Sequence, residues 1–232
     1  MQTGILKYPG GHGDQELQHC LPLISDDIVK EVWYEALDTS DIDVLFIGGG
    51  IPCMKNGKAD LDSPFIDQLL KFAASGKHII GINNGFRLLC ELNLLPGRVL
   101  QNINDRFICR FVYMKPQTQQ SVMTRGLNVD DIFLVPLATY SGRYDAREED
   151  LMDMRQKGQI VFRYSDKEGR ITEKVNFPGS AENIAAICNA DKRIFGLIPQ
   201  PERAFTPGSH NTDGEIILDT LLKSISALKA RN

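Results

Sequence analysis

The fold is decided by one stretch, Ile79-Ile80-Gly81-Ile82-Asn83-Asn84-Gly85-Phe86-Arg87-Leu88-Leu89-Cys90. A β-branched run leads into a Gly-x-x-x-Gly segment, and an apolar pattern with helical spacing follows it. This order predicts a sharp strand-to-helix turn of the nucleophile-elbow kind, which presents one side chain above the edge of a sheet. The two glycines, each two positions from Asn83, allow close backbone approach because they carry no Cβ.

Asn83 stands at the apex of the predicted turn, where an enzyme of this architecture carries Ser or Cys. A carboxamide has no proton-loss route to a nucleophile near neutral pH. The sequence therefore predicts the architecture of nucleophilic catalysis without its attacking atom. Asparagine also tolerates unusual backbone angles better than most residues, so it preserves the turn while removing the chemistry.

Further segments continue the pattern along the chain, at residues 104–110, 159–164, 179–185 and 196–204. Residues 81–87 resemble G-I-C-N-G-F-Q, residues 104–110 resemble part of N-x-S-x-x-F-x-C-R, and residues 196–204 resemble G-x-x-P-H-P-E-R-A. In this joint order the segments resemble class I glutamine amidotransferases, most closely the glutaminase subunit of phosphoribosylformylglycinamidine (FGAM) synthase. The resemblance covers residues 5–204, which is most of the chain.

The distribution of apolar residues predicts an α/β fold. Strands are expected at residues 3–8, 29–33, 43–47 and 78–82, and helices at 63–74, 148–157 and 213–229. Residues 159–165 and 174–177 are predicted to pair as strands around a turn. We expect a three-layer, doubly wound, flavodoxin-like and mostly parallel sheet of the class I glutamine amidotransferase type, with its site at the carboxyl strand ends. One domain over residues 1–232 is predicted.

Composition narrows the partners of this 232-residue chain. A formal net charge of −4 gives no electrostatic case for nucleic acid or an anionic membrane. Five scattered cysteines form no C-x-x-C pair or histidine-adjacent cluster, so reduced thiols, a cytoplasmic location and no zinc are expected. No apolar run approaches a membrane span. Neither a metal nor an organic cofactor is predicted.

The resemblance assigns three catalytic positions, Asn83, Gln200 and Glu202. In class I amidotransferases a cysteine attacks glutamine, a histidine takes the thiol proton and later protonates ammonia, and a glutamate orients that histidine. Gln200 replaces the histidine and cannot bind and release a proton near pH 7. Glu202 is retained, but with no imidazole to orient.

The resemblance also suggests a substrate-binding set, formed by Gly49, Gly50, Asn84 and Arg87. Three glycines after a predicted strand let backbone N–H groups face inward, as in an oxyanion hole, although composition alone favours a flexible tight turn. Gly49 and Gly50 match the P-G-G hole of the family. Arg87 is either an anion contact near a helix N-terminus or a surface helix arginine.

Two of the three catalytic positions, Asn83 and Gln200, differ from the family pattern. This favours a pseudo-enzyme: a structural, regulatory or ligand-binding subunit that does not hydrolyse glutamine. The implied partner is the synthetase large subunit of FGAM synthase, with its small bridging subunit where one exists, and the altered pocket would take glutamine or another small ligand. The alternative is an active amidohydrolase that supplies ammonia through a rearranged site, with Cys53 as nucleophile and His12 as base.

Overall fold

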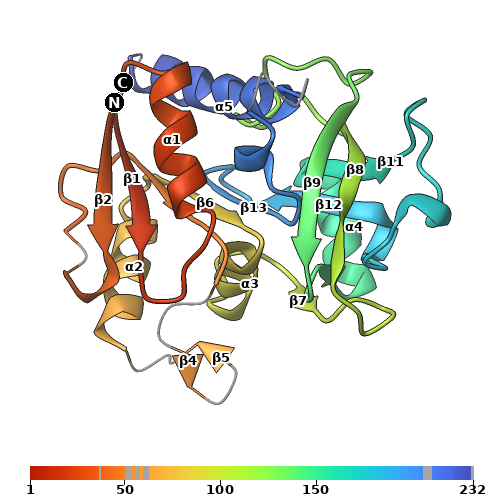
Figure 1. Ribbon diagram of the computed structural model, residues 1–232, viewed down its shortest axis with the longest axis horizontal. Coiled ribbons are helices and arrows are strands. Elements are labelled where there is room, and N and C mark those ends of the chain that lie inside the picture. Colours follow the sequence, from red (N-terminus) through yellow and green to blue (C-terminus); the bar gives the residue numbers. More distant parts are fainter. Residues whose placement is uncertain (37, 51–53, 56–57, 60–62, 206–210, 231–232) are drawn as a thin grey trace.

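The computed structural model describes residues 1–36, 38–50, 54–55, 58–59, 63–205 and 211–230. A nine-stranded sheet runs through the molecule in the order β2-β1-β3-β6-β13-β12-β11-β8-β9 (Figure 1). Five of these strands are parallel to one another: β1 (Gln2–Lys7), β2 (Ile28–Trp33), β3 (Val44–Ile47), β6 (His78–Ile82) and β13 (Ile194–Leu197). These five parallel strands position the site, because their carboxyl ends all lie on the same side of the sheet.

The other four strands continue the sheet in antiparallel fashion: β8 (Ile108–Pro116), β9 (Phe133–Thr139), β11 (Ile160–Ser165) and β12 (Ile184–Cys188). β9 forms the outer edge and carries Pro136 in its middle, as edge strands tolerate. Two short antiparallel pairs complete the described strands: β7 (Arg98–Leu100) with β10 (Arg143–Asp145), and β4 (Met54–Lys55) with β5 (Lys58–Ala59).

Helices cover both faces of the sheet. The crossover through α1 (Asp14–Ile24) leads from β1 to β2, and the one through α2 (Pro64–Ala74) leads from β3 to β6 in the opposite direction across the sheet. Right-handed crossovers therefore place the two helices on opposite faces. α5 (Asp213–Lys229) packs beside α1, while α3 (Asn84–Glu91) follows β6 and α4 (Glu148–Lys157) precedes β11 (Figure 1). The predicted doubly wound α/β class is thus confirmed. No helix in the described ranges is both long and apolar enough to cross a membrane.

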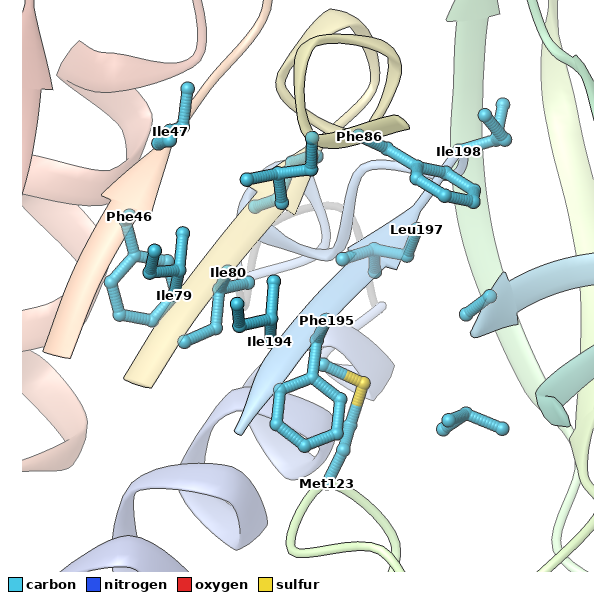
Figure 2. Packing of buried hydrophobic residues seen from close by; sticks show 14 of the residues in the cluster. Phe46, Ile47, Ile79, Ile80, Phe86, Met123, Ile194, Phe195, Leu197 and Ile198 are labelled. Atoms are coloured by element: carbon cyan, nitrogen blue, oxygen red, sulfur yellow. The ribbon is translucent and has the colours of Figure 1, made fainter. Parts of the chain in front are cut away.

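The core lies between the central strands and their helices. Phe46, Ile80 and Phe195, from three adjacent parallel strands, are fully buried, and Met123 packs beneath Phe195 (Figure 2). These strands read as nearly continuous apolar runs because both of their faces are covered. Buried apolar surface contributes about 25 cal/mol per Å² to stability, so the packing of these strands stabilises the part of the sheet whose carboxyl ends carry the site.

One predicted strand is wrong. Residues 174–177 do not pair with β11; residues Glu173–Val175 instead form a short 3-10 helix, η2. Both edges of β11 are already occupied, by β12 on one side and β8 on the other. The segment satisfies its polar groups locally, since the Asn176 side chain donates to the Ser180 carbonyl at 2.6 Å and accepts from the Ser180 N–H at 2.9 Å.

Candidate functional site

The turn between β6 and α3 holds Asn83 in an unusual backbone conformation. Its φ of 56° and ψ of −113° lie where L-residues are rarely found, a strain of about 1–3 kcal/mol. Glycine is required on both sides. A Cβ on Gly85 would overlap the carbonyl oxygen of Ile47, and a Cβ on Gly81 would lie 2.6 Å from the backbone of Gly85. The predicted close approach of backbones around Asn83 is therefore present.

The side chain of Asn83 points towards the end of β9. It is only 2% exposed; its Nδ2 donates to the carbonyl oxygen of Ala138 at 3.0 Å, and its Oδ1 accepts from the Thr139 hydroxyl at 3.4 Å. The Asn83 backbone N–H donates to Leu197 at 2.8 Å, which ties the turn to the end of β13. Both ends of this carboxamide are therefore engaged by the protein.

Gln200 binds the same residue of β9 from the other side. Its side chain is 1% exposed, and its Oε1 accepts a hydrogen bond from the Ala138 N–H at 3.1 Å. Its own N–H donates to the carbonyl of Pro136 at 2.8 Å. The N–H and the carbonyl of Ala138 are thus held by the side chains of Asn83 and Gln200, two of the three predicted catalytic positions, an arrangement we call the Ala138 clamp.

Glu202 lies two residues further on, in the 3-10 helix η4 (Pro201–Arg203). Its carboxyl is 3% exposed, and its Oε2 has no hydrogen-bond partner among the described residues. Burial raises the pKa of this carboxyl to about 8, so it is predominantly neutral at pH 7. Glu202 does not line the cavity beside Asn83; it lines a neighbouring one of about 420 Å³, together with Cys20 and His19.

The glycine loop after β3 pairs with the loop after β1. The N–H of Gly49 donates to the carbonyl of His12 at 2.7 Å, and the His12 N–H donates back to the Gly49 carbonyl at 3.0 Å. The imidazole of His12 packs on the α-carbon of Gly49, where no side chain would fit. The Gly49 amide is therefore already bonded, while Gly50 adopts a φ of 86°; their role as oxyanion donors stays a prediction.

A cavity of about 510 Å³ opens at this edge of the sheet. Among its lining residues are four predicted ones and the proposed alternative base, together with an arginine that sequence reasoning missed: Asn83, Asn84, Arg87, Gln200, His12 and Arg203. Arg203 directly follows Glu202 in the P-x-P-E-R-A segment, so its position in that motif was the available signal. Cys53, the alternative nucleophile, lies outside the described residues.

Charge in this cavity is largely compensated. Arg87 forms an ion pair with Glu91 one turn along α3, Nε to Oε1 at 2.8 Å, and Arg203 pairs with Glu16 at 3.1 Å. Partial desolvation, and secondly the positive charge of Arg203, lower the pKa of the His12 imidazole, which favours its neutral form. A neutral imidazole retains the capacity to accept a proton. Among the described residues no His, Cys, Asp and Glu cluster could hold a metal ion.

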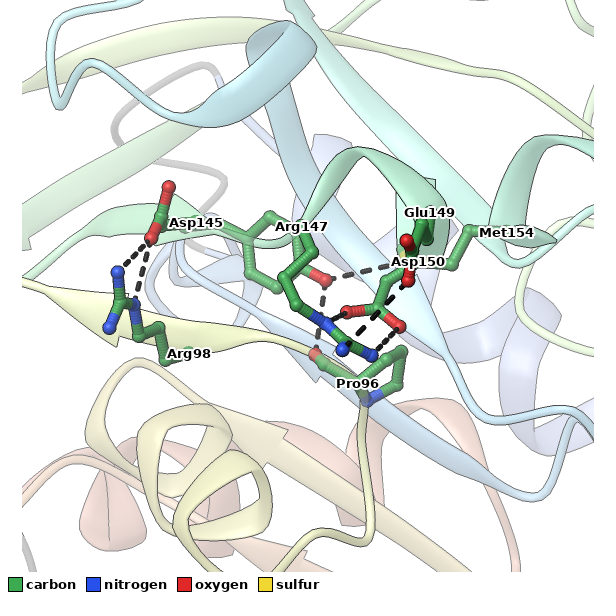
Figure 3. A network of polar contacts seen from close by, with 8 residues as sticks. Pro96, Arg98, Asp145, Arg147, Glu149, Asp150 and Met154 are labelled. Carbon is green, nitrogen blue, oxygen red and sulfur yellow. Dashed lines mark hydrogen bonds and ion pairs between the residues drawn. The ribbon is translucent and has the colours of Figure 1, made fainter. Parts of the chain in front are cut away.

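A larger cavity, of about 900 Å³, lies elsewhere, between residues 93–98 and α4. Its charged rim is internally paired: Arg98 contacts Asp145 at 2.7 Å and Arg147 contacts Asp150 at 2.8 Å (Figure 3). The Tyr144 hydroxyl beneath them donates to the Pro96 carbonyl at 3.0 Å. No residue predicted to act in chemistry lines this space, so we place the candidate site at the smaller cavity.

Comparison with known proteins identifies the family of this chain. A profile of the CobB/CobQ-like glutamine amidotransferase domain matches residues 5–219. The phosphoribosylformylglycinamidine synthase subunit PurQ of Aquifex aeolicus is 37% identical over 96% of this chain and 99% of the relative, and that of Koribacter versatilis is 33% identical over 97% and 99%. The solved structure of PurLQS from Thermotoga maritima superimposes with a TM-score of 0.81 at 26% identity, over 96% of this chain and 97% of that one.

These matches span the strands, the turn at Asn83 and the Gln200–Glu202 segment alike. The TM-score of 0.81 over nearly the whole of both chains shows that this chain and the PurLQS chain share a fold. The chain therefore belongs to the glutamine amidotransferase family with a CobB/CobQ-like domain, in the branch that contains the PurQ subunits of FGAM synthase.

Proposed function

We propose that this chain is a PurQ-type subunit of FGAM synthase in purine biosynthesis that keeps the amidotransferase fold but does not hydrolyse glutamine. The supporting observation is the Ala138 clamp: Asn83 and Gln200, at the positions of the family's cysteine and histidine, are buried and hydrogen-bonded to one residue of β9. Amidotransfer needs a thiolate to attack the amide carbon of glutamine and a proton for the departing ammonia. Neither carboxamide supplies these.

The expected loss of rate is large. Removing the nucleophile or base of a comparable hydrolytic triad lowers turnover about a millionfold. The remaining rate enhancement over the uncatalysed reaction is roughly a thousandfold and comes from binding and the oxyanion hole. That enhancement is too small to supply nitrogen to a biosynthetic reaction. We infer that the subunit docks on a synthetase large subunit, with a small bridging subunit where one exists, and that free ammonia is the nitrogen donor.

The first experiment measures ammonia release from glutamine by the purified chain, alone and with the synthetase subunits of the same organism. We expect no glutamine turnover, together with amidine synthesis when ammonium chloride is supplied. Ordinary enzymic turnover of glutamine by the unaltered protein would overturn the proposal.

Restoring both altered positions provides a second arm. The Asn83→Cys, Gln200→His variant should regain measurable glutaminase activity, because the backbone turn is already formed and Glu202 is retained two residues after position 200. A matched control, Asn84→Cys with Gln200→His, places the thiol one residue beyond the apex and should stay inactive. Equal activity of the two variants would show that the thiol does not act from the apex.

A second candidate is supported by the position of His12. This residue lines the same cavity as Asn83 and Gln200, so a base is available there if Cys53 supplies a thiol. Under this reading glutamine turnover by the unaltered protein would be lost in both Cys53→Ser and His12→Gln. If turnover is absent from the outset, or survives both substitutions, this candidate fails.

A further inference from the structure

A further cavity, of about 370 Å³, lies at the opposite end of the parallel strands, where they begin. His78 starts β6, Arg193 precedes β13 and Asp43 precedes β3, and all three line it. The last turn of α5, with Lys229, closes one side. This cavity shares no described lining residue with the one around Asn83, so its role is independent of glutamine chemistry.

Positive charge is concentrated in this cavity, although the whole chain carries a net charge of −4. The described lining holds two carboxylates, Asp43 and Asp191, against five cationic side chains. The five are Lys77, Arg125, Lys192, Arg193 and Lys229. The surplus is three positive charges, in a concave region where a field is focused more strongly than on an open surface.

Most of these cations are positioned by neutral groups rather than by carboxylates. Lys77 donates to the carbonyls of Thr39 and Ser40 at 3.1 and 3.0 Å, and Lys192 donates to the side-chain oxygen of Gln120 at 3.0 Å. Such bonds hold an ammonium group in place without neutralising its charge.

The remaining three cations differ in how they are held. Arg193 donates to the carbonyl of Gly76, again a neutral acceptor. Lys229 is paired with a carboxylate, Asp43, at 2.7 Å. Arg125 is exposed, and no hydrogen bond or ion pair of its guanidinium occurs among the described residues. Four of the five charges are therefore available to an anion.

The base of the cavity is apolar. Val122 and Ile225 are 3% and 2% exposed, and Leu228 is partly buried beside them. The volume lies within the usual range of small-molecule sites, about 300–1,000 Å³. A terminal phosphate carries about −1.5 to −2 at pH 7, so one phosphate leaves part of the surplus charge unbalanced and two balance it.

We propose that this cavity binds a small molecule carrying two phosphate groups, with the arginine and lysine side chains on the phosphates and any apolar portion on the Val122–Ile225 base. Arginine suits this role because its planar fork meets phosphate oxygens two at a time. Inorganic diphosphate and a nucleoside diphosphate share this chemistry, and the arms of the test separate them.

The test is titration calorimetry of the full chain with pyrophosphate, ADP and adenosine at low and at physiological ionic strength. We expect pyrophosphate to bind and its affinity to fall as salt is raised. Tighter binding of ADP than of pyrophosphate assigns a nucleoside diphosphate, and equal or weaker binding of ADP assigns the inorganic form. Absence of pyrophosphate binding overturns the proposal, whatever adenosine does.

Paired charge reversals locate the binding. Arg125→Glu should weaken pyrophosphate binding at least tenfold, whereas Lys223→Glu should leave it within twofold. Lys223 lies on the exposed side of α5, where it pairs with Asp219 outside the cavity. Both variants replace a cation with a carboxylate, so they change the net charge of the protein equally. Equal weakening by both would mean attraction to overall charge only, and would overturn the site. If Arg125→Glu folds poorly, Lys192→Gln, a milder change, takes its place and should also weaken pyrophosphate binding.

His78 gives a readout that general charge effects would not move. Burial, and secondly Arg193, lower the pKa of its imidazole to about 4, opposed by Asp43, and Lys77 adjoins it in the chain. A bound anion should raise this pKa, because negative charge stabilises the imidazolium. In NMR titrations the His78 resonance should titrate at higher pH with saturating pyrophosphate than without it. An unshifted His78 would overturn the proposal.

Discussion

Replacing Gln200 with alanine tests whether the Ala138 clamp stabilises the fold. The substitution removes the acceptor of the Ala138 N–H and empties the space of a side chain that is 1% exposed. An orphaned, mostly buried donor costs about 1–3 kcal/mol, and the removed packing adds to this. We expect Gln200→Ala to lower the free energy of unfolding by about 2–3 kcal/mol. In a chain of this length that corresponds to roughly 5–10 °C in Tm.

The measurement is urea unfolding followed by circular dichroism, with a thermal scan alongside. The control is Gln18→Ala, because Gln18 is an exposed glutamine on α1 and should change stability by less than about 0.5 kcal/mol. A Gln200→Ala protein as stable as the control would refute the reasoning, since the buried hydrogen bond would then contribute nothing measurable.

The same clamp predicts coupling between the two altered positions. Asn83→Ala orphans the carbonyl of Ala138, as Gln200→Ala orphans its N–H. Once one bond is lost, this end of β9 can move to reach water, so the second loss should cost less. The double variant should therefore fall short of additivity by about 0.5–1 kcal/mol. Strictly additive losses would mean that the two side chains act independently.

Two further predictions concern packing and pH. Gly196→Ala should destabilise the protein by about 1–3 kcal/mol in urea unfolding, because its Cβ would overlap the ring of fully buried Phe86; Gly126→Ala, in an exposed loop, serves as the control. Glu202 binds a proton more tightly in the folded state, so stability should fall by about 1 kcal/mol per pH unit between its unfolded pKa near 4.5 and its folded pKa near 8. Glu202→Gln should remove this slope, and an unchanged slope would show that another group titrates.

Local sequence pattern predicted those parts of the fold that depend on local chemistry. The glycine spacing around Asn83 demanded a tight turn, and the structure places both glycines against backbone atoms. Parallel strands share an edge, so the loops that hold His12, Asn83 and Gln200 meet although they are distant in sequence. The predicted helices and most predicted strands follow from the same periodicities.

Other features depend on which backbone groups are already occupied, and sequence pattern does not encode that. Residues 174–177 look like a strand, yet β11 has no free edge for them. The Gly49 amide looks like an available donor, yet His12 accepts its hydrogen bond. The basic cavity draws on segments that are far apart in the sequence, from Asp43 to Lys229, and has no local signature. Each of these is decided by tertiary pairing.

The persistence of the strained turn at Asn83 has a physical explanation that does not require catalysis. The backbone conformation costs about 1–3 kcal/mol, which an active amidotransferase would retain in order to present its nucleophile. Here the bonds from Asn83 to Ala138 and Thr139 offset that cost, because they satisfy polar groups at the end of an edge strand. Asn83 tolerates a positive φ, and its side chain reaches β9. It therefore stabilises the turn by connecting it to this strand. On this account the altered residues are fitted to one another, which the double-variant measurement tests directly.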